Sequence, residues 1–162
     1  MTIKASIRDY LLANSAVSAL LANSAACYSF PAPRSAARPY MMLSRIDEQD
    51  ERTINEFIDV RYEQWQVDVV ADTDAEAEEL KDAVIDCLQC ADRVQMGTYW
   101  VYSSTLIGSE DTSELEDNDS EHRTCRMTRT FDIRRSAREI EGGELDFSVS
   151  TNSGLLAVIA AA

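Results

Sequence analysis

Two cysteines, Cys87 and Cys90, have the spacing of half a zinc site. A structural zinc needs four ligands, and Cys27, Cys125 or His122 could complete the set. The sequence has no second closely spaced pair, and Cys87 falls on the apolar stripe of an expected helix. Thiol redox chemistry needs the pair at a helix N-terminus, whereas these cysteines lie at the C-terminal end. We therefore expect core packing, with no metal and no other cofactor.

The single histidine, His122, is the next candidate for chemistry. A catalytic triad requires a base that a carboxylate orients toward a nucleophile, and the sequence contains no glycine-framed serine elbow. The five glycines also form no phosphate-binding loop. We expect a solvated or ion-paired histidine and no enzymatic activity.

An acidic segment places seven carboxylates within twelve residues, at Glu110, Asp111, Glu114, Glu116, Asp117, Asp119 and Glu121. The spacing fits no EF-hand template, and no glycine stands at the sharp turn that such a calcium loop needs. We expect a long loop over residues 109–121. It is either simply solvated or makes an electrostatic contact with a basic partner surface. Six arginines follow, and on an exposed strand they are expected to neutralise this loop or neighbouring subunits: Arg123, Arg126, Arg129, Arg134, Arg135 and Arg138.

The composition indicates one ordinary domain. The chain has 162 residues, and 29 Asp and Glu against 15 Lys and Arg give a net charge of -14. This charge disfavours general binding to nucleic acid or to an anionic membrane. The N-terminus lacks a signal-peptide pattern, which predicts synthesis in the cytosol. The longest apolar run, Leu155–Ala162, is much shorter than the roughly 20 residues of a membrane span.

Hydrophobic periodicity predicts the elements that must position these residues. The expected helices cover residues 3–14, 15–21 and 74–88, and the expected strands cover residues 27–30, 40–46, 57–71, 98–107 and 123–134. Residues 47–55 read as a polar turn. Two strand connections are too short for crossover helices. The prediction is an α+β fold, with a largely antiparallel sheet of four to five strands and helices packed on one face.

The strand over residues 57–71 has an unusual hydrophobic pattern. Its first half is apolar at even positions such as Ile58 and Val60, and its second half at odd positions such as Trp65 and Val67. A regular strand would place the two sets on opposite faces of the sheet. A bulge or a bend near Glu63–Gln64 would bring them to one face.

The order and spacing of these elements resemble the tail-completion or tail-terminator proteins of long-tailed bacteriophages. The resemblance extends from Thr2 to Ile133 and includes no catalytic signature. Its matching segments are Ala16–Leu21 after the leading helix, Arg38–Tyr40 opening a strand, Trp65–Ala71 ending the long strand, Asp72–Ala77 starting a helix, and Thr128–Ile133 in the last strand.

The resemblance implies a structural virion protein. Such proteins form rings, usually of six, at the head-proximal end of the tail tube, where they stop tube growth and offer a surface to the head connector. The implied partners are further copies of the chain, the tail-tube protein and the connector or neck proteins. DNA would pass through the lumen without specific binding, and the acidic segment could then act as a repulsive lining.

The C-terminal residues extend beyond the usual end of such a domain. We expect a domain over residues 1–135 and an extension over residues 136–162. The extension ends in a run without polar side chains that includes Leu155, Leu156, Val158 and Ile159. An apolar end of this kind must be covered. We expect it to dock on a neighbouring subunit, and packing back on its own domain is the alternative.

A second reading comes from a different functional class. Tyr99, Trp100 and Tyr102 are grouped in one expected strand. They could line a ligand site on the sheet face that the helices leave free, as in a small ligand-binding or regulatory module. Packing in the core or between subunits would explain these aromatic residues equally well.

Overall fold

The computed structural model describes residues 2–50, 60–89, 93–115 and 123–136, which form three helices and six strands. The helices are α1 (Ile3–Ala13), α2 (Ser15–Leu20) and α3 (Asp74–Leu88). The strands are β1 (Cys27–Ser29), β2 (Tyr40–Asp50), β3 (Val60–Ala71), β4 (Val94–Met96), β5 (Tyr99–Leu115) and β6 (Arg123–Ser136).

A short polar side chain caps the start of each helix. Thr2 Oγ1 accepts the backbone N–H of Ala5, and Asn14 Oδ1 accepts the first free N–H groups of α2. Thr73 Oγ1 accepts the N–H of Glu76 at 3.3 Å and donates to the Glu76 carboxylate at 3.0 Å. Because these groups satisfy donors that have no partner within the helix, each helix starts at a residue that its sequence alone indicates.

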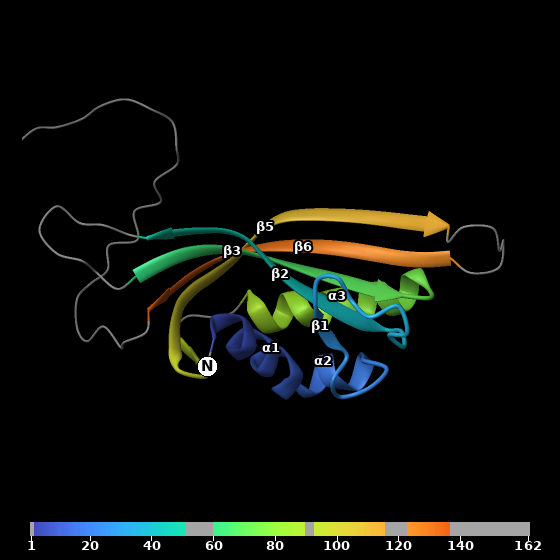
Figure 1. Cartoon of the computed structure of the whole chain (residues 1–162), viewed down its shortest axis with the longest axis horizontal. Coiled ribbons are helices and arrows are strands. Elements are labelled where there is room, and N and C mark those ends of the chain that lie inside the picture. The colour runs from blue at the N-terminus through green and yellow to red at the C-terminus, as the bar shows by residue number, and fades with distance from the viewer. Residues whose placement is uncertain (1, 51–59, 90–92, 116–122, 137–162) are drawn as a thin grey trace, which may run out of the picture.

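The strands form one sheet in the order β1-β2-β3-β6-β5-β4, in which β1 and β2 are parallel and all other neighbours antiparallel. The helices lie together on one side of this curled sheet (Figure 1). The predicted α+β class and the single helical layer are confirmed. The sequence did not predict β4. It forms because Gly97, at a φ of 61°, makes the tight turn that folds Val94–Met96 back onto β5.

The predicted bulge in β3 is wrong. β3 pairs with β6 without interruption from Val60 to Ala71, and the extra residue is Ile46 in β2, opposite the step from Trp65 to Gln64. The two apolar sets of β3 therefore do lie on opposite faces. The predicted turn is also wrong at its start, because residues 47–50 continue β2 along β3; residues 51–55 lie outside the described ranges.

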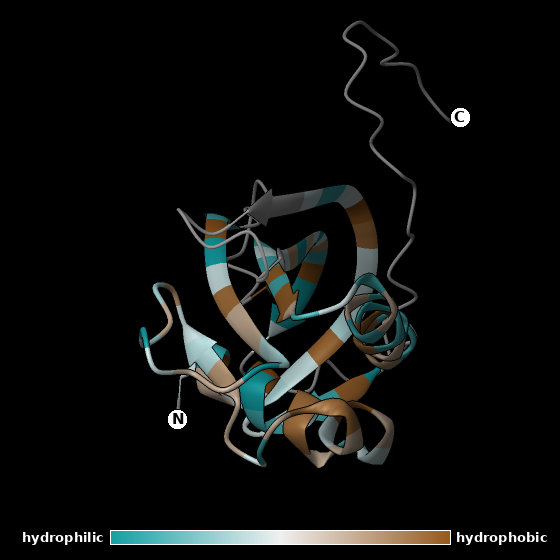
Figure 2. Ribbon diagram, turned by 90° about the vertical axis from the view of Figure 1, so that its right-hand side faces the viewer, coloured by the Kyte–Doolittle hydropathy of each residue, from teal (hydrophilic) through white to brown (hydrophobic). Residues whose placement is uncertain are grey.

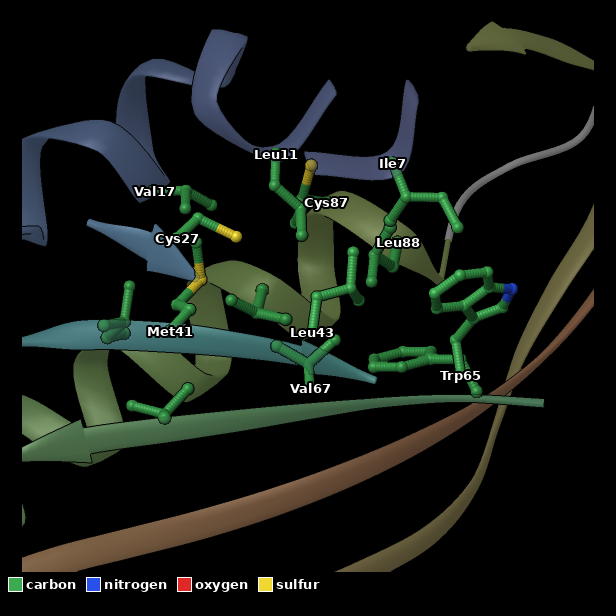
Figure 3. Packing of buried hydrophobic residues seen from close by; sticks show 14 of the residues in the cluster. Ile7, Leu11, Val17, Cys27, Met41, Leu43, Trp65, Val67, Cys87 and Leu88 are labelled. Carbon is green, nitrogen blue, oxygen red and sulfur yellow. The ribbon is translucent and has the colours of Figure 1, made fainter. Parts of the chain in front are cut away.

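The core lies between the helices and the odd-numbered face of β3 and β6. Leu80 and Leu88 of α3 and Ile7 of α1 belong to the same buried cluster as Trp65 and Phe131. Figure 3 shows Trp65 near Leu88 and Ile7 from the helical layer. Hydrophobic and hydrophilic residues alternate along the strands (Figure 2), which is typical of a sheet with one buried face.

The expected core packing of the cysteines is seen at the three that the structure describes. Cys27, Cys87 and Cys125 are buried in the hydrophobic cluster. Burial raises the pKa of the Cys27 thiol to about 11, which keeps it protonated and inert at neutral pH. Cys90 lies outside the described residues. None of the described helices is long and apolar enough to span a membrane.

Candidate interaction surface

The sheet face opposite the helices is polar, and we call it the open face. It carries the even-numbered residues of β3 and β6 and their partners in β5. Its central residues are Gln64, Gln66, Asp68, Arg126, Thr128, Thr130, Asp132, Thr105, Gly108, Glu110 and Thr112. In the described part of the chain no helix covers this face (Figure 1).

Asp68 is the centre of a hydrogen-bond network on the open face. Its side chain is 1% exposed although no helix lies above it. Oδ1 accepts from Thr128 Oγ1 at 2.6 Å and from Gln66 Nε2 at 2.8 Å, and Oδ2 accepts from Arg126 Nη2 at 2.9 Å. A buried carboxylate needs such partners because it has lost its water. The network joins β3 to β6 and fixes the side chains of this face.

An open depression of about 460 Å³ lies beside this network. It is lined by Gln66, Gly108, Ser109, Glu110, Thr112, Arg126, Thr128 and Thr130. These walls are amide, hydroxyl and charged groups, whereas small-molecule sites are concave and mainly apolar. The depression therefore favours contact with a polar macromolecular surface over capture of a small ligand.

The acidic segment is not the loop that the sequence predicts over its first part. Residues 109–115 belong to β5, because β6 provides a strand with which they pair. Glu110 lies on the open face beside Thr128, whereas Asp111 lies on the opposite face, where Arg129 Nη1 donates to it at 2.6 Å. This hydrogen bond and the guanidinium charge lower the pKa of Asp111.

The other predicted interface residues cannot be placed. The backbone of Glu114 is in β5, but its side chain is not described. The remaining ones lie outside the described residues: Glu116, Asp117, Asp119, Glu121, Leu155, Leu156, Val158 and Ile159, together with His122.

The arginines of β6 were expected on an exposed strand, and this expectation is wrong because β6 lies between β3 and β5. Arg129 does neutralise the acidic segment through Asp111, as predicted. Arg126 instead pairs with Asp68, and the guanidinium of Arg134 lies 5.2 Å from the ring centroid of Tyr62. Arg126, Arg129 and Arg134 therefore link β6 to its neighbouring strands, while the side chain of Arg123 and all of Arg138 are outside the described part of the chain.

A buried ion pair on the helical side was missed at the sequence level. The Glu63 side chain is fully buried and accepts from Trp65 Nε1 at 2.7 Å. Arg135 donates to the same carboxylate through Nε at 3.0 Å and through Nη2. The Arg135 guanidinium also lies 4.7 Å from the ring centroid of Tyr99. One feature of the sequence pointed to this position: Glu63 is an odd-numbered residue of the strand, like Trp65, and therefore lies on the buried face.

Tyr99 and Tyr102 of β5 serve packing, whereas Trp100 is half-buried and pairs with Ser136 of β6. Tyr102 is 2% exposed, and Tyr99 contacts Arg135 and packs against the core. Their positions give no support to the ligand-binding reading. Among the described residues, no three His, Cys, Asp or Glu side chains are grouped so that they could hold a metal ion.

The described residues thus present a helix-backed, largely antiparallel sheet with a polar open face, which favours a protein that acts through surface contact. Residues 5–151 match the family described as Tail completion protein gp17, and the chain belongs to this family. Family membership makes it a structural protein of the virion tail.

A solved structure shares the fold. A chain in the virion of a native gene transfer agent particle aligns with a TM-score of 0.65 and 19% sequence identity, over 83% of this chain and 94% of that one. None of the curated protein sequences matches this chain.

Proposed function

We propose that the chain is a tail-terminator subunit that forms a ring, of six copies, at the head-proximal end of the tail tube. There it ends tube growth and joins the tail to the head connector, without catalysis. The observation that carries this proposal is the family match over residues 5–151. The fold shared with a virion component supports it. Closed rings arise when one surface of a subunit repeatedly binds a different surface of the next.

The open face and the acidic end of β5 are the proposed contacts with other tail or neck proteins. Gln66 and Thr128, held in place by the buried Asp68, form a prearranged polar surface, and Glu110 is exposed beside it. A fixed polar surface loses little side-chain entropy on binding. The rest of the acidic segment, through Glu114, Glu116, Asp117, Asp119 and Glu121, extends this contact or repels passing DNA.

The segment over residues 136–162 is proposed as an extension of a domain formed by residues 1–135. Its apolar end includes Leu155, Leu156, Val158 and Ile159, and we propose that these side chains dock on a neighbouring subunit. Truncation after Gly143 tests this part of the proposal. A shortened protein that keeps its oligomeric state and tube binding, and loses only thermal stability, contradicts docking on a neighbour.

The decisive experiment is a tube-growth assay with purified tail-tube protein. We expect the chain to elute as a ring in light scattering, to appear as a ring by electron microscopy, and to stop elongation when added to growing tubes. A chain that stays monomeric at high concentration and does not associate with tube protein contradicts the proposal.

A further inference from the structure

Both outer edges of the sheet are largely unpaired in the part of the chain that the structure describes. β1 pairs with β2 only at Met41–Leu43, and β4 pairs with β5 only at Tyr99–Val101. The outer sides of β2 from Ser44 to Asp50 and of β5 from Tyr102 to Leu115 therefore have no strand beside them among the described residues. Unpaired N–H and C=O groups on an edge strand are a template for another strand.

The exposed large hydrophobic residues of the described chain lie at these same edges. They are Phe30, which is 59% exposed, Ile46, which is 53% exposed, and Ile107, which is 49% exposed. Phe30 directly follows β1, and each isoleucine is the extra residue of a bulge, Ile46 in β2 and Ile107 in β5. Single exposed hydrophobic residues are ordinary. Here, however, they occupy opposite edges of one sheet, and at Ile46 and Ile107 the extra residue of the bulge is itself the exposed apolar side chain.

The two isoleucines also lie at the same height along the strands. Ile46 lies opposite the step from Trp65 to Gln64, and Ile107 opposite the step from Phe131 to Thr130. Trp65 and Phe131 are directly paired, so the bulges are within one residue of each other along the strand direction. A rotation about an axis parallel to the strands would place Ile107 of one copy beside Ile46 of the next. The remaining offset of one residue is a stagger between neighbouring strands that a closed sheet accommodates by tilting its strands.

The strand directions fit the same rotation. β2, β3, β6 and β5 alternate in direction, so β5 of one copy would be antiparallel to β2 of the next. The alternation within the subunit would continue across the boundary. Directly opposed residues of antiparallel strands have Cα atoms roughly 4.5 to 5.5 Å apart, which permits close side-chain contact.

The charges along the two edges are complementary in this arrangement. Thr105 of β5 is exposed and lies at the height of the exposed Asp47 of β2, so a hydroxyl group would face a carboxylate. Farther along, Glu110 and Asp111 are at the height of Met42 and Met41, where β1 forms the edge.

The connection that follows β1 carries Arg34, whose side chain is exposed. The acidic end of β2 would face neutral side chains of β5. Two facing rows of carboxylates would oppose assembly, and no such rows meet in this arrangement.

We propose that β5 of one subunit pairs antiparallel to β2 of the next, with Ile107 against Ile46, so that the sheet continues from copy to copy around the ring. The partner surface is a second copy of this chain, and the contact is heterologous: two different edges meet. This inference rests on the proposed ring, and it names the residues that form the ring contact.

Cysteine cross-linking tests the pairing directly. Under mild oxidation, I46C/I107C should give a ladder of covalent oligomers on a non-reducing gel, ending at the size of the ring. A mixture of the single variants I46C and I107C should give covalent dimers only, and each single variant alone should give no cross-link. The double variant A19C/A75C is the matched control, because both residues are exposed on helices and away from the edges.

Charge variants test the same contact without cross-linking. I107K alone should abolish the ring in light scattering, and I46E combined with I107K should restore it. A75K is the control and should leave the ring intact, while unchanged circular dichroism shows that each variant folds.

The outcomes separate this inference from the proposed function. Rings that form normally but give no cross-link between positions 46 and 107, or that survive I107K, would overturn the edge pairing and leave the proposed function standing. Cross-links in a single variant alone would indicate a two-fold contact and would also overturn it. Wild-type protein that forms no ring and does not stop tubes would overturn the proposed function itself.

Discussion

The two faces of the same sheet are built on different principles. On the helical face, β3 presents Trp65 and Val67 to α1 and α3, and burial of apolar surface holds the layers together. On the open face, the same strand presents Gln66 and Asp68, whose hydrogen bonds are satisfied by neighbours in the sheet. A face whose central carboxylate is satisfied by neighbours within the sheet needs no covering layer at that point. It is therefore available to a partner protein, whereas the helical face is covered by the helices that pack on it.

The largest expected effect is on the helical face. Phe131→Ala should destabilise the protein by about 3–5 kcal/mol, because Phe131 is fully buried and its removal leaves a cavity. Urea unfolding at one protein concentration measures this change. Thr105→Ala, on the exposed part of the open face, is the control and should shift stability by less than about 0.5 kcal/mol. Equal losses of stability at both positions would contradict the distinction between the two faces.

A smaller effect is expected from the polar network of the open face. Asp68→Ala should cost about 1–3 kcal/mol, because it removes the acceptor for Thr128 and Arg126. The Arg126 side chain is 32% exposed and can regain water, which keeps the cost below that of the core cavity. Glu110→Ala, exposed on the same face, is the matched control. A loss of stability as large as that of Phe131→Ala would show that the open face contributes as much to the stability of the fold as the core does.

The smallest effect concerns the pH dependence of the open face. Burial raises the pKa of Asp132, so the folded state holds its proton more tightly than the unfolded state. Below the ordinary pKa of an aspartate the Asp132 carboxyl is neutral in both states, so its burial does not lower stability. As pH rises through the raised pKa, the folded protein must ionise this buried carboxyl, and the free energy of unfolding of the wild type falls. Asp132→Asn should be more stable than wild type at pH 7 and equal to it near pH 3. Thermal melts at the two pH values measure this, and an Asn variant that is less stable at pH 7 contradicts it.

Local signals in the sequence were sufficient for much of the fold. The helix starts at Thr2, Asn14 and Thr73 depend on side chains within three residues, so short-range chemistry indicates them. The order of the elements carried the resemblance to tail-completion proteins, and the family match over residues 5–151 confirms it. Strand β4 was missed because a three-residue strand has almost no periodicity and depends on the Gly97 turn.

The candidate surface was predicted less well than the fold. Glu110 and Asp111 were expected in a loop, since seven carboxylates in twelve residues look solvated, but pairing with β6 and the Arg129 partner hold them in a strand. Glu63 was interpreted as a bulge site, because nothing near it in the chain shows that Arg135, 72 residues away, neutralises it.

The sequence by itself determined the helix boundaries, the alternation along the strands and the family, because these depend on neighbouring residues or on their order. Tertiary structure alone decided which strands are neighbours, and hence which residues lie at an edge. Ile46 and Ile107 are far apart in the chain, and each is an ordinary apolar residue within a strand. They come to the same height on opposite edges because Trp65 pairs with Phe131 between them, and strand pairing is a long-range property that no local pattern encodes.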